Sequence, residues 1–102
     1  MIIVRQVFQA QFGQGGALAQ AMSAGIPKTM PASWGPSRWR LMTDLSGPFD
    51  TVVLEVEAAS LAEWEKRRAE LFASPAFQEQ VGSSGRLMAS GRNEFYCVEA
   101  EG

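Results

Sequence analysis

Arg68 is the residue of this 102-residue chain whose type and position are best suited to chemistry. At helical spacing it falls within an apolar stripe made by Leu61, Trp64, Leu71 and Phe72. A guanidinium in such a stripe could enter a pocket and hold a carboxylate or a phosphate. The alternative is that its stem lies along the stripe while its head reaches water or pairs with Glu65.

Aromatic side chains are the second group of candidates, because several of them together could line a pocket for an organic molecule. Ordinary core packing is the alternative for the lining candidates beside Arg68, which are Trp39, Trp64, Tyr96, Phe8 and Phe12. Trp34 differs from them because it lies between prolines and glycines, where no core requires a tryptophan. It is a candidate for a lid over the pocket or for a contact between subunits.

Other reactive groups are few. The sequence contains no histidine, the commonest general base and metal ligand, and its single cysteine, Cys97, cannot form a disulfide within the chain. Because a thiol needs a base or a positive field to become a thiolate, Cys97 is expected to be inert. Gly13, Gly15 and Gly16 lack the spacing of a nucleotide-binding loop and predict a tight turn. We expect no metal ion, no haem and no other cofactor.

Composition argues against several classes of protein, among them nucleic-acid binders and membrane proteins. A formal net charge of −2 argues against a general nucleic-acid binder, which needs clustered lysine and arginine. No apolar run approaches the roughly 20 residues that span a bilayer, so no membrane association is expected. Arg5 interrupts the apolar N-terminal run, unlike a signal peptide. We expect one domain over residues 1–102, located in the cytoplasm.

The first part of the chain predicts a strand and a helix. Residues 2–9 are rich in β-branched side chains and predict a strand. Apolar residues at helical spacing predict a short helix over 17–25, with Gly25 as its C-cap. Residues 26–37 contain three prolines and are expected to form no regular element.

Residues 39–57 alternate on both sides of a Ser-Gly-Pro turn and predict a β-hairpin. Matching the apolar faces across a loop at 46–49 places the following residues opposite one another: Trp39 and Val56, Leu41 and Leu54, Arg40 and Glu55, and Arg38 and Glu57. Opposite charges across a strand pair stabilise it by about 0.2–1 kcal/mol each. A slip of one residue would expose an apolar face, so this register is strongly favoured.

The last part of the chain predicts two helices and a strand. Ser60 and Glu63 form a capping box, which indicates the start of a helix that continues through residue 73. A second short helix is predicted over 75–81, with a proline in its first turn and Gly82 at its end. The remaining segments are expected to be a loop at 83–91 and a strand at 93–100.

The order is therefore β-α-β-β-α-β, a ferredoxin-like α+β fold with a four-stranded antiparallel sheet and both helices on one face. The other face is expected to carry Arg5, Val7, Arg40, Met42, Val53 and Glu55. This mixture is too apolar for water alone and too charged for a closed core. A second copy of the sheet is therefore expected to cover it in a homodimer, and the alternative for its charged residues is a catalytic cluster.

With these elements in place, the chain resembles the dimeric α/β-barrel superfamily, above all its NIPSNAP-like and antibiotic-biosynthesis-monooxygenase-like members. The resemblance is carried by MTDLSGPFDTVVLEVE (42–57), SLAEWEKRRAELFASPAFQE (60–79) and the opening strand through Gly16. It implies two ferredoxin-like subunits packed sheet to sheet, each with a pocket between sheet and helices. It implies no single activity, because relatives include cofactor-independent oxygenases, haem-degrading enzymes and small-molecule isomerases or dehydratases. Members that bind haem or use acid–base chemistry commonly need a histidine, which this sequence lacks.

Two classes of function follow. The first is a NIPSNAP-like protein that binds a small organic molecule between sheet and helices, with cofactor-independent monooxygenation as its candidate activity. The second is a non-catalytic dimeric module that binds a partner or regulates one. A pocket lined by aromatic residues and reached by Arg68 or Tyr96 favours the first class, whereas a solidly packed interface between helices and sheet favours the second.

Overall fold

The computed structural model describes residues 1–29 and 38–102, so the candidate Trp34 lies outside the described residues. The elements are, in chain order, β1 (Ile2–Ala10), α1 (Gly15–Thr29), β2 (Trp39–Thr43), β3 (Thr51–Ala58), α2 (Leu61–Phe72), α3 (Pro75–Ser84), the 3-10 turn η2 (Gly85–Leu87) and β4 (Met88–Cys97). The α+β fold class and the ferredoxin-like arrangement are confirmed, with the second helical segment divided into α2 and α3.

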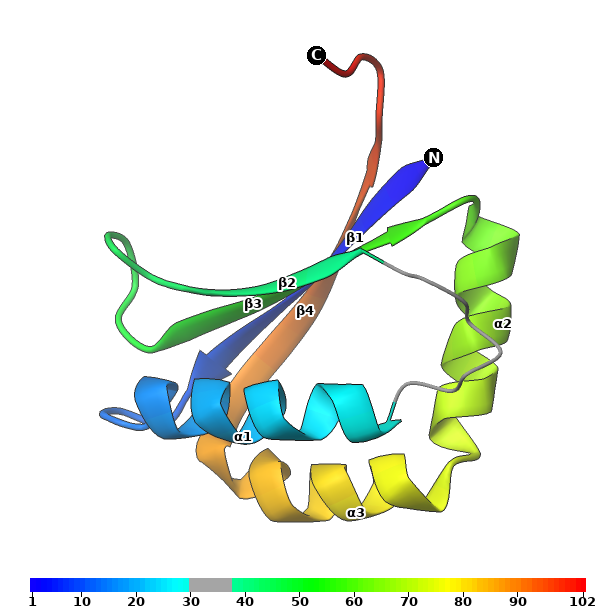
Figure 1. Ribbon diagram of the computed structural model, residues 1–102. Coiled ribbons are helices and arrows are strands. Elements are labelled where there is room, and N and C mark those ends of the chain that lie inside the picture. The colour runs from blue at the N-terminus through cyan, green and yellow to red at the C-terminus, as the bar shows by residue number, and fades with distance from the viewer. Residues whose placement is uncertain (30–37) are drawn as a thin grey trace.

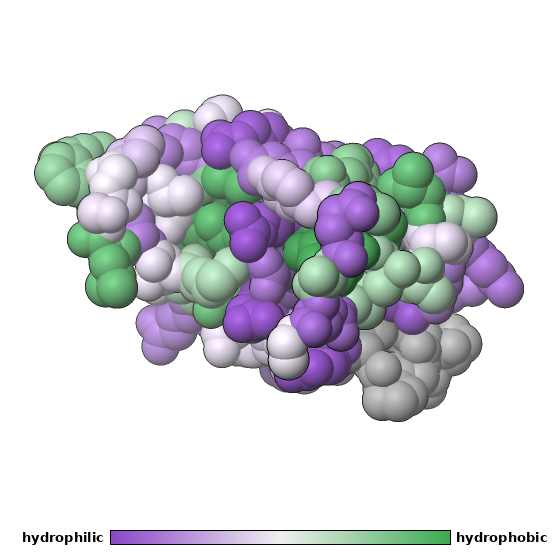
Figure 2. Space-filling view, turned by 90° about the horizontal axis from the view of Figure 1, so that it is seen from above, coloured by the Kyte–Doolittle hydropathy of each residue, from purple (hydrophilic) through white to green (hydrophobic). Residues whose placement is uncertain are grey.

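The four strands form one antiparallel sheet in the order β2-β3-β1-β4. All three helices lie on one side of it, with α1 and α3 next to each other and α2 standing across their ends (Figure 1). Figure 2 looks onto the opposite side, where hydrophilic and hydrophobic residues are interspersed. The hairpin register is confirmed, because Trp39 lies opposite Val56 and Leu41 opposite Leu54.

The core lies between the sheet and the helices in two clusters. One cluster joins α1 to the sheet through Ala10, Leu18, Met22, Ile26 and Val52. The other joins α2 to the sheet through Val4, Val56, Ala58 and Trp64. Trp39 and Leu54 contact both clusters. Even-numbered residues of β1 and β3 therefore face the helices, as the alternation along a strand requires.

A tight turn connects β1 to α1, as its glycines predict. The Asp50 carboxylate accepts hydrogen bonds from the amides of Gly13 at 2.8 Å and Gly15 at 3.0 Å. Gly13 has a φ of +79°, which favours glycine, and a Cβ on Gly15 would lie 2.8 Å from the Asp50 Cα atom. The start of α1 is thus bound to an anion of the protein itself.

Helix α1 is longer than the sequence predicts. Gly25 is not its C-cap, because the helix continues to Thr29, and the expectation of irregular structure is therefore wrong for residues 26–29. Gly25 is buried under Gln80 of α3, and a Cβ on it would lie 2.2 Å from the Gln80 side chain. Gln80 Nε2 in turn donates to the Ala21 carbonyl at 3.1 Å. This glycine allows two helices to approach closely.

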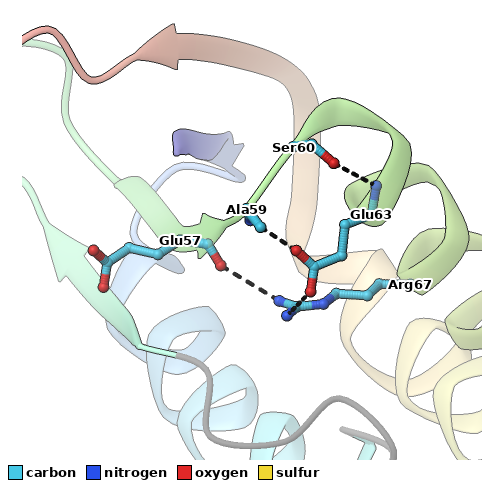
Figure 3. A network of polar contacts seen from close by, with 5 residues as sticks. All are labelled: Glu57, Ala59, Ser60, Glu63 and Arg67. Atoms are coloured by element: carbon cyan, nitrogen blue, oxygen red, sulfur yellow. Dashed lines mark hydrogen bonds and ion pairs between the residues drawn. The ribbon is translucent and has the colours of Figure 1, made fainter.

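The capping box at the start of α2 is present with one difference (Figure 3). The Glu63 amide donates to Ser60 Oγ at 3.1 Å, but the Glu63 carboxylate accepts from the Ala59 amide at 2.8 Å, one residue before the N-cap. Glu63 also pairs with Arg67, whose Nη1 donates to the Glu57 carbonyl at 3.4 Å. These contacts bind the first turns of α2 to the end of β3.

The predicted boundaries after α2 need correction. Helix α3 passes through Gly82 and ends at Ser84, and β4 begins at Met88 where a loop was expected. Gly82 does not stop the helix. Beyond it, Ser84 Oγ donates a hydrogen bond to the Gln80 carbonyl, and the Gly85 amide donates one to the Val81 carbonyl. Strand β4 starts early because it pairs along the whole of β1, and it ends at Cys97.

Candidate functional site

A cavity of about 290 Å³ lies between the sheet and the helices. Its walls come from β1, β3, β4, all three helices and the turn η2. The lining residues are Gln6, Phe8, Met22, Ile26, Thr29, Leu54, Val56, Trp64, Leu71, Phe72, Phe77, Gln80, Val81, Ser84, Gly85 and Met88. Most of these side chains are apolar or aromatic, which is the usual lining of a small-molecule site.

The polar lining residues are bound largely to the protein itself. Thr29 Oγ1 donates to the Ile26 carbonyl at 3.1 Å, and Ser84 Oγ donates to the Gln80 carbonyl at 2.8 Å. Gln80 Nε2 is bound to the α1 backbone, as described above. None of the described lining residues carries an ionisable side chain. This lining can hold an apolar molecule, but it offers no acid or base for proton transfer.

Two of the aromatic candidates, Phe8 and Trp64, line this cavity, whereas the other candidates among the described residues do not. Trp39 is half-buried and packs against both core clusters. Phe12 is exposed beside the turn between β1 and α1, and Trp34 lies outside the described residues. Tyr96 lies opposite Ile3 on the sheet face away from the helices, and its hydroxyl donates to Glu94 at 2.8 Å.

Arg68 lies in a second hollow, between α2 and β4. This groove of about 380 Å³ is lined by Leu61, Trp64, Glu65, Arg68, Asn93 and Phe95. The Arg68 guanidinium is exposed and lies over the Phe72 ring, with 4.6 Å between its Cζ atom and the ring centroid. It therefore follows the surface of the apolar stripe and does not line the cavity between the sheet and the helices.

Sequence reasoning missed the contribution of α3 to the cavity. Phe77, Val81 and Ser84 recur at the spacing of one helix face, and Met88 follows where β4 begins. The spacing of Phe77 and Val81 was a usable signal. Ser84 and Met88 had no such signal, because Gly82 resembles the end of a helix and the sequence assigns residues 83–91 to a loop.

The open face of the sheet, away from the helices, holds the six residues predicted for a dimer interface. They form two adjacent rows that run across strands β2, β3 and β1. Glu55 lies between Arg40 of β2 and Arg5 of β1, and a nitrogen–oxygen distance of 2.8 Å joins it to each. In the next row Met42, Val53 and Val7 lie side by side. The hydrogen bond to Glu55 raises the pKa of Arg5 above its usual value. The predicted pairs of Arg40 with Glu55 and Arg38 with Glu57 are both present.

Strand β4 extends this face with charged residues that sequence reasoning did not include. Glu94 lies opposite Arg5, so the row across the sheet reads Arg40, Glu55, Arg5 and Glu94, with alternating charge. The Tyr96 hydroxyl and then Arg92, at 2.8 Å each, hold the pKa of Glu94 below its usual value. The Arg5 guanidinium also lies 5.3 Å from the Tyr96 ring centroid.

Among the described residues, no group of three or more histidine, cysteine, aspartate or glutamate residues is placed to hold a metal ion. No helix in the described ranges is both long and apolar enough to cross a bilayer.

Solved structures share this arrangement of strands and helices. A NIPSNAP domain protein from Burkholderia xenovorans superposes with a TM-score of 0.85 at 16% identity, over 98% of this chain and 96% of that one. A NIPSNAP-like domain protein from the same organism gives 0.85 at 21% identity, over 97% and 85%. The chain has the NIPSNAP fold. A Chloroflexus aurantiacus protein, provisionally named an antibiotic biosynthesis monooxygenase, gives 0.71 at 17% identity, over 99% and 96%.

These likenesses extend over nearly the whole chain and confirm the ferredoxin-like α+β fold that the sequence indicated. At such low identities they concern the fold alone. No family model matches the sequence, and no curated protein matches it either.

Proposed function

We propose that this protein is a homodimer that binds a small, mostly apolar organic molecule in the cavity between sheet and helices. The observation that carries the proposal is the cavity itself, with about 290 Å³ of space and a lining dominated by aromatic and aliphatic side chains. An apolar cavity of roughly 150 Å³ in another protein is large enough to bind benzene. The space available here suits a ligand about twice that size.

Binding without turnover is the form of this proposal that the lining supports. Ser84 is the nearest to a nucleophile, and its hydroxyl proton is directed to the Gln80 carbonyl, with no ionisable lining residue among those described to remove it. A cofactor-independent monooxygenase, the finer possibility, would need its substrate to supply electrons to oxygen. Oxygen uptake above the protein-free rate with an electron-rich naphthalenediol would assign that activity instead.

The homodimer is proposed from the open face of the sheet. Its central residues Val7, Met42 and Val53 are apolar, and the charged residues beside them already pair within one subunit. A face whose charges are neutralised in this way can meet a second copy about a two-fold axis with little unpaired charge to desolvate. Two such sheets packed face to face would give each subunit a closed core on both sides.

Ligand binding can be tested with a variant that fills the cavity. Gly85 lines it, and a Cβ there would meet only Val81 Cγ1, at 3.9 Å, so Gly85→Leu places a side chain in open space. Gly82→Leu is the matched control, because Gly82 lies nearby in α3, is exposed and is outside the lining. The series from 1-hexanol to 1-decanol should raise the melting temperature of the wild type and of Gly82→Leu, but not of Gly85→Leu. If no member of the series affects the wild type, the proposed function is wrong.

The dimer can be tested by sedimentation equilibrium at micromolar concentration. Val53→Glu places a charge without a partner at the centre of the proposed interface and should weaken association by about 1–3 kcal/mol or more. Gln20→Glu, on the exposed surface of α1, is the control and should leave association unchanged. A wild type that sediments as a monomer would refute the dimer and leave the ligand proposal in place.

A further inference from the structure

The cavity and the groove between α2 and β4 have a common wall. Trp64 lines both of them. Phe72 lines the cavity and carries the Arg68 guanidinium over its ring, while Arg68 itself lines the groove. A molecule that fills the cavity and extends past Phe72 therefore meets a cation on its way into the groove.

Arg68 differs in its partners from most other arginines of the chain. Arg5, Arg38, Arg40, Arg67 and Arg92 each pair with a carboxylate. No carboxylate within residues 1–29 and 38–102 forms such a pair with Arg68, although Glu65 precedes it by one helical turn in the same groove. The donors of its guanidinium are thus available to an anion from outside the protein.

The surroundings of Arg68 combine apolar surface with a second donor. Leu61 and Phe95 of the groove and the adjoining Phe72 are each about half exposed, so they offer apolar contacts that a ligand would remove from water. Asn93 projects from β4 into the same groove and can donate a hydrogen bond through its amide. A polar head beside Arg68 would therefore be joined to a body that prefers the apolar lining.

We propose that the ligand is an amphipathic organic acid, with its apolar body in the cavity and its carboxylate held by Arg68 and Asn93 in the groove. This inference rests on the proposed function, because it assumes that the cavity is occupied. The Glu65 carboxylate in the groove offsets part of the positive field of Arg68. That balance favours a singly charged carboxylate over the doubly charged phosphate, which Glu65 would repel more strongly.

The test compares decanoate with 1-decanol, which have the same chain but differ in charge, by isothermal titration calorimetry at neutral pH. Wild-type protein should bind decanoate about tenfold more tightly than 1-decanol, the effect of one charge-assisted contact. Arg68→Met keeps the apolar stem, so it should retain 1-decanol binding and lose the preference for decanoate. Lys66→Met, which removes the same charge from α2 at a residue outside the groove, should preserve the preference.

A second variant moves the preference in the other direction. Glu65→Gln removes the competing anion from the groove and should increase the preference for decanoate by about threefold or more. Equal binding of decanoate and 1-decanol by the wild type, or an unchanged preference in Arg68→Met, would overturn the inference while the proposed function stands. Failure of both molecules to bind would instead refute the proposed function.

Discussion

Replacement of Glu55 by glutamine should be the most damaging conservative change on the open face of the sheet. Glu55 Oε1 lies 2.8 Å from Arg5 Nε, and Oε2 lies 2.8 Å from Arg40 Nε. The Glu55 side chain is only 10% exposed. Glu55→Gln keeps its shape but leaves the two guanidinium groups facing each other without the anion between them.

The expected loss of stability follows from the exposure of the three groups. A hydrogen bond to a sheltered charged group contributes about 1.5–3 kcal/mol, whereas an exposed ion pair contributes about 0–1 kcal/mol. In a single subunit Glu55 is sheltered, but Arg5 and Arg40 are 44% and 70% exposed in their side chains, so water screens both pairs. For that subunit we expect Glu55→Gln to cost about 1–2 kcal/mol of the free energy of unfolding. The proposed dimer would increase this loss by covering the open face.

Glu57→Gln is the matched control on the same strand and face. Glu57 is 25% exposed and lies 3.4 Å from the exposed Arg38, so its loss should cost about 0.5 kcal/mol or less. Urea denaturation at equal protein concentrations would measure both variants. High salt should remove the effect of Glu57→Gln but only part of the effect of Glu55→Gln, since buried pairs are screened less. If the two variants are equally stable at low salt, burial of Glu55 does not strengthen its pairs and the reasoning fails.

Three further predictions concern local structure. The Ala59 amide, and then Arg67, hold the pKa of Glu63 below its ordinary 4.5. The stability that this carboxylate contributes should therefore be present above about pH 4.5 and be lost as the pH falls further. The difference in melting temperature between wild type and Glu63→Gln should shrink accordingly in acid. Gly25→Ala should destabilise the wild type by displacing Gln80, but stabilise a Gln80→Ala background by about 1 kcal/mol in urea denaturation; stabilisation in both backgrounds would contradict the close packing. Asp50→Ala should lower the free energy of unfolding by about 2–3 kcal/mol in the same assay, because it removes the acceptor for the Gly13 and Gly15 amides. Asp50→Asn should lower it less, because asparagine tolerates the φ of +62° and keeps an acceptor. Equal losses would count against this explanation.

The hairpin shows how far the sequence alone can define this fold. Two independent patterns agree on its register: apolar faces that must match, and opposite charges that must meet. Leu41 and Leu54 carry the first pattern, and Arg40 and Glu55 carry the second. Because a slip of one residue would violate both patterns, the pairing could be derived without any knowledge of the rest of the chain.

The helix boundaries could not be derived in the same way, because distant contacts decide them. Gly25 and Gly82 are both ordinary stop signals in a local interpretation. Gly25 instead lies under the Gln80 side chain, and Gly82 has open space around it and lies inside α3. No local pattern distinguishes a glycine that ends a helix from one that lets another helix approach.

The sequence predicts the kind of candidate site but only a few of its residues, such as Phe8 and Trp64. A pocket between sheet and helices was expected, and a cavity lies there, but its lining comes from seven elements that meet only in the folded chain. Arg68 was placed near the apolar stripe correctly, yet a helical projection cannot tell which of two adjacent hollows a long side chain enters. In the structure, its guanidinium follows the Phe72 ring into the groove beside β4.

The alternation of side chains along the strands separates the two proposed roles of the sheet. In β3, Leu54 and Val56 line the cavity, while Val53 and Glu55 belong to the open face. A substitution at an odd-numbered position of β3 therefore changes the open face directly, and it affects the cavity only through the backbone. A substitution at an even-numbered position does the reverse. A variant such as Val53→Glu should separate the subunits while each cavity keeps its lining. Comparison of ligand affinity in that variant and in the wild type would thus measure how strongly association itself shapes the cavity, apart from any change in its residues.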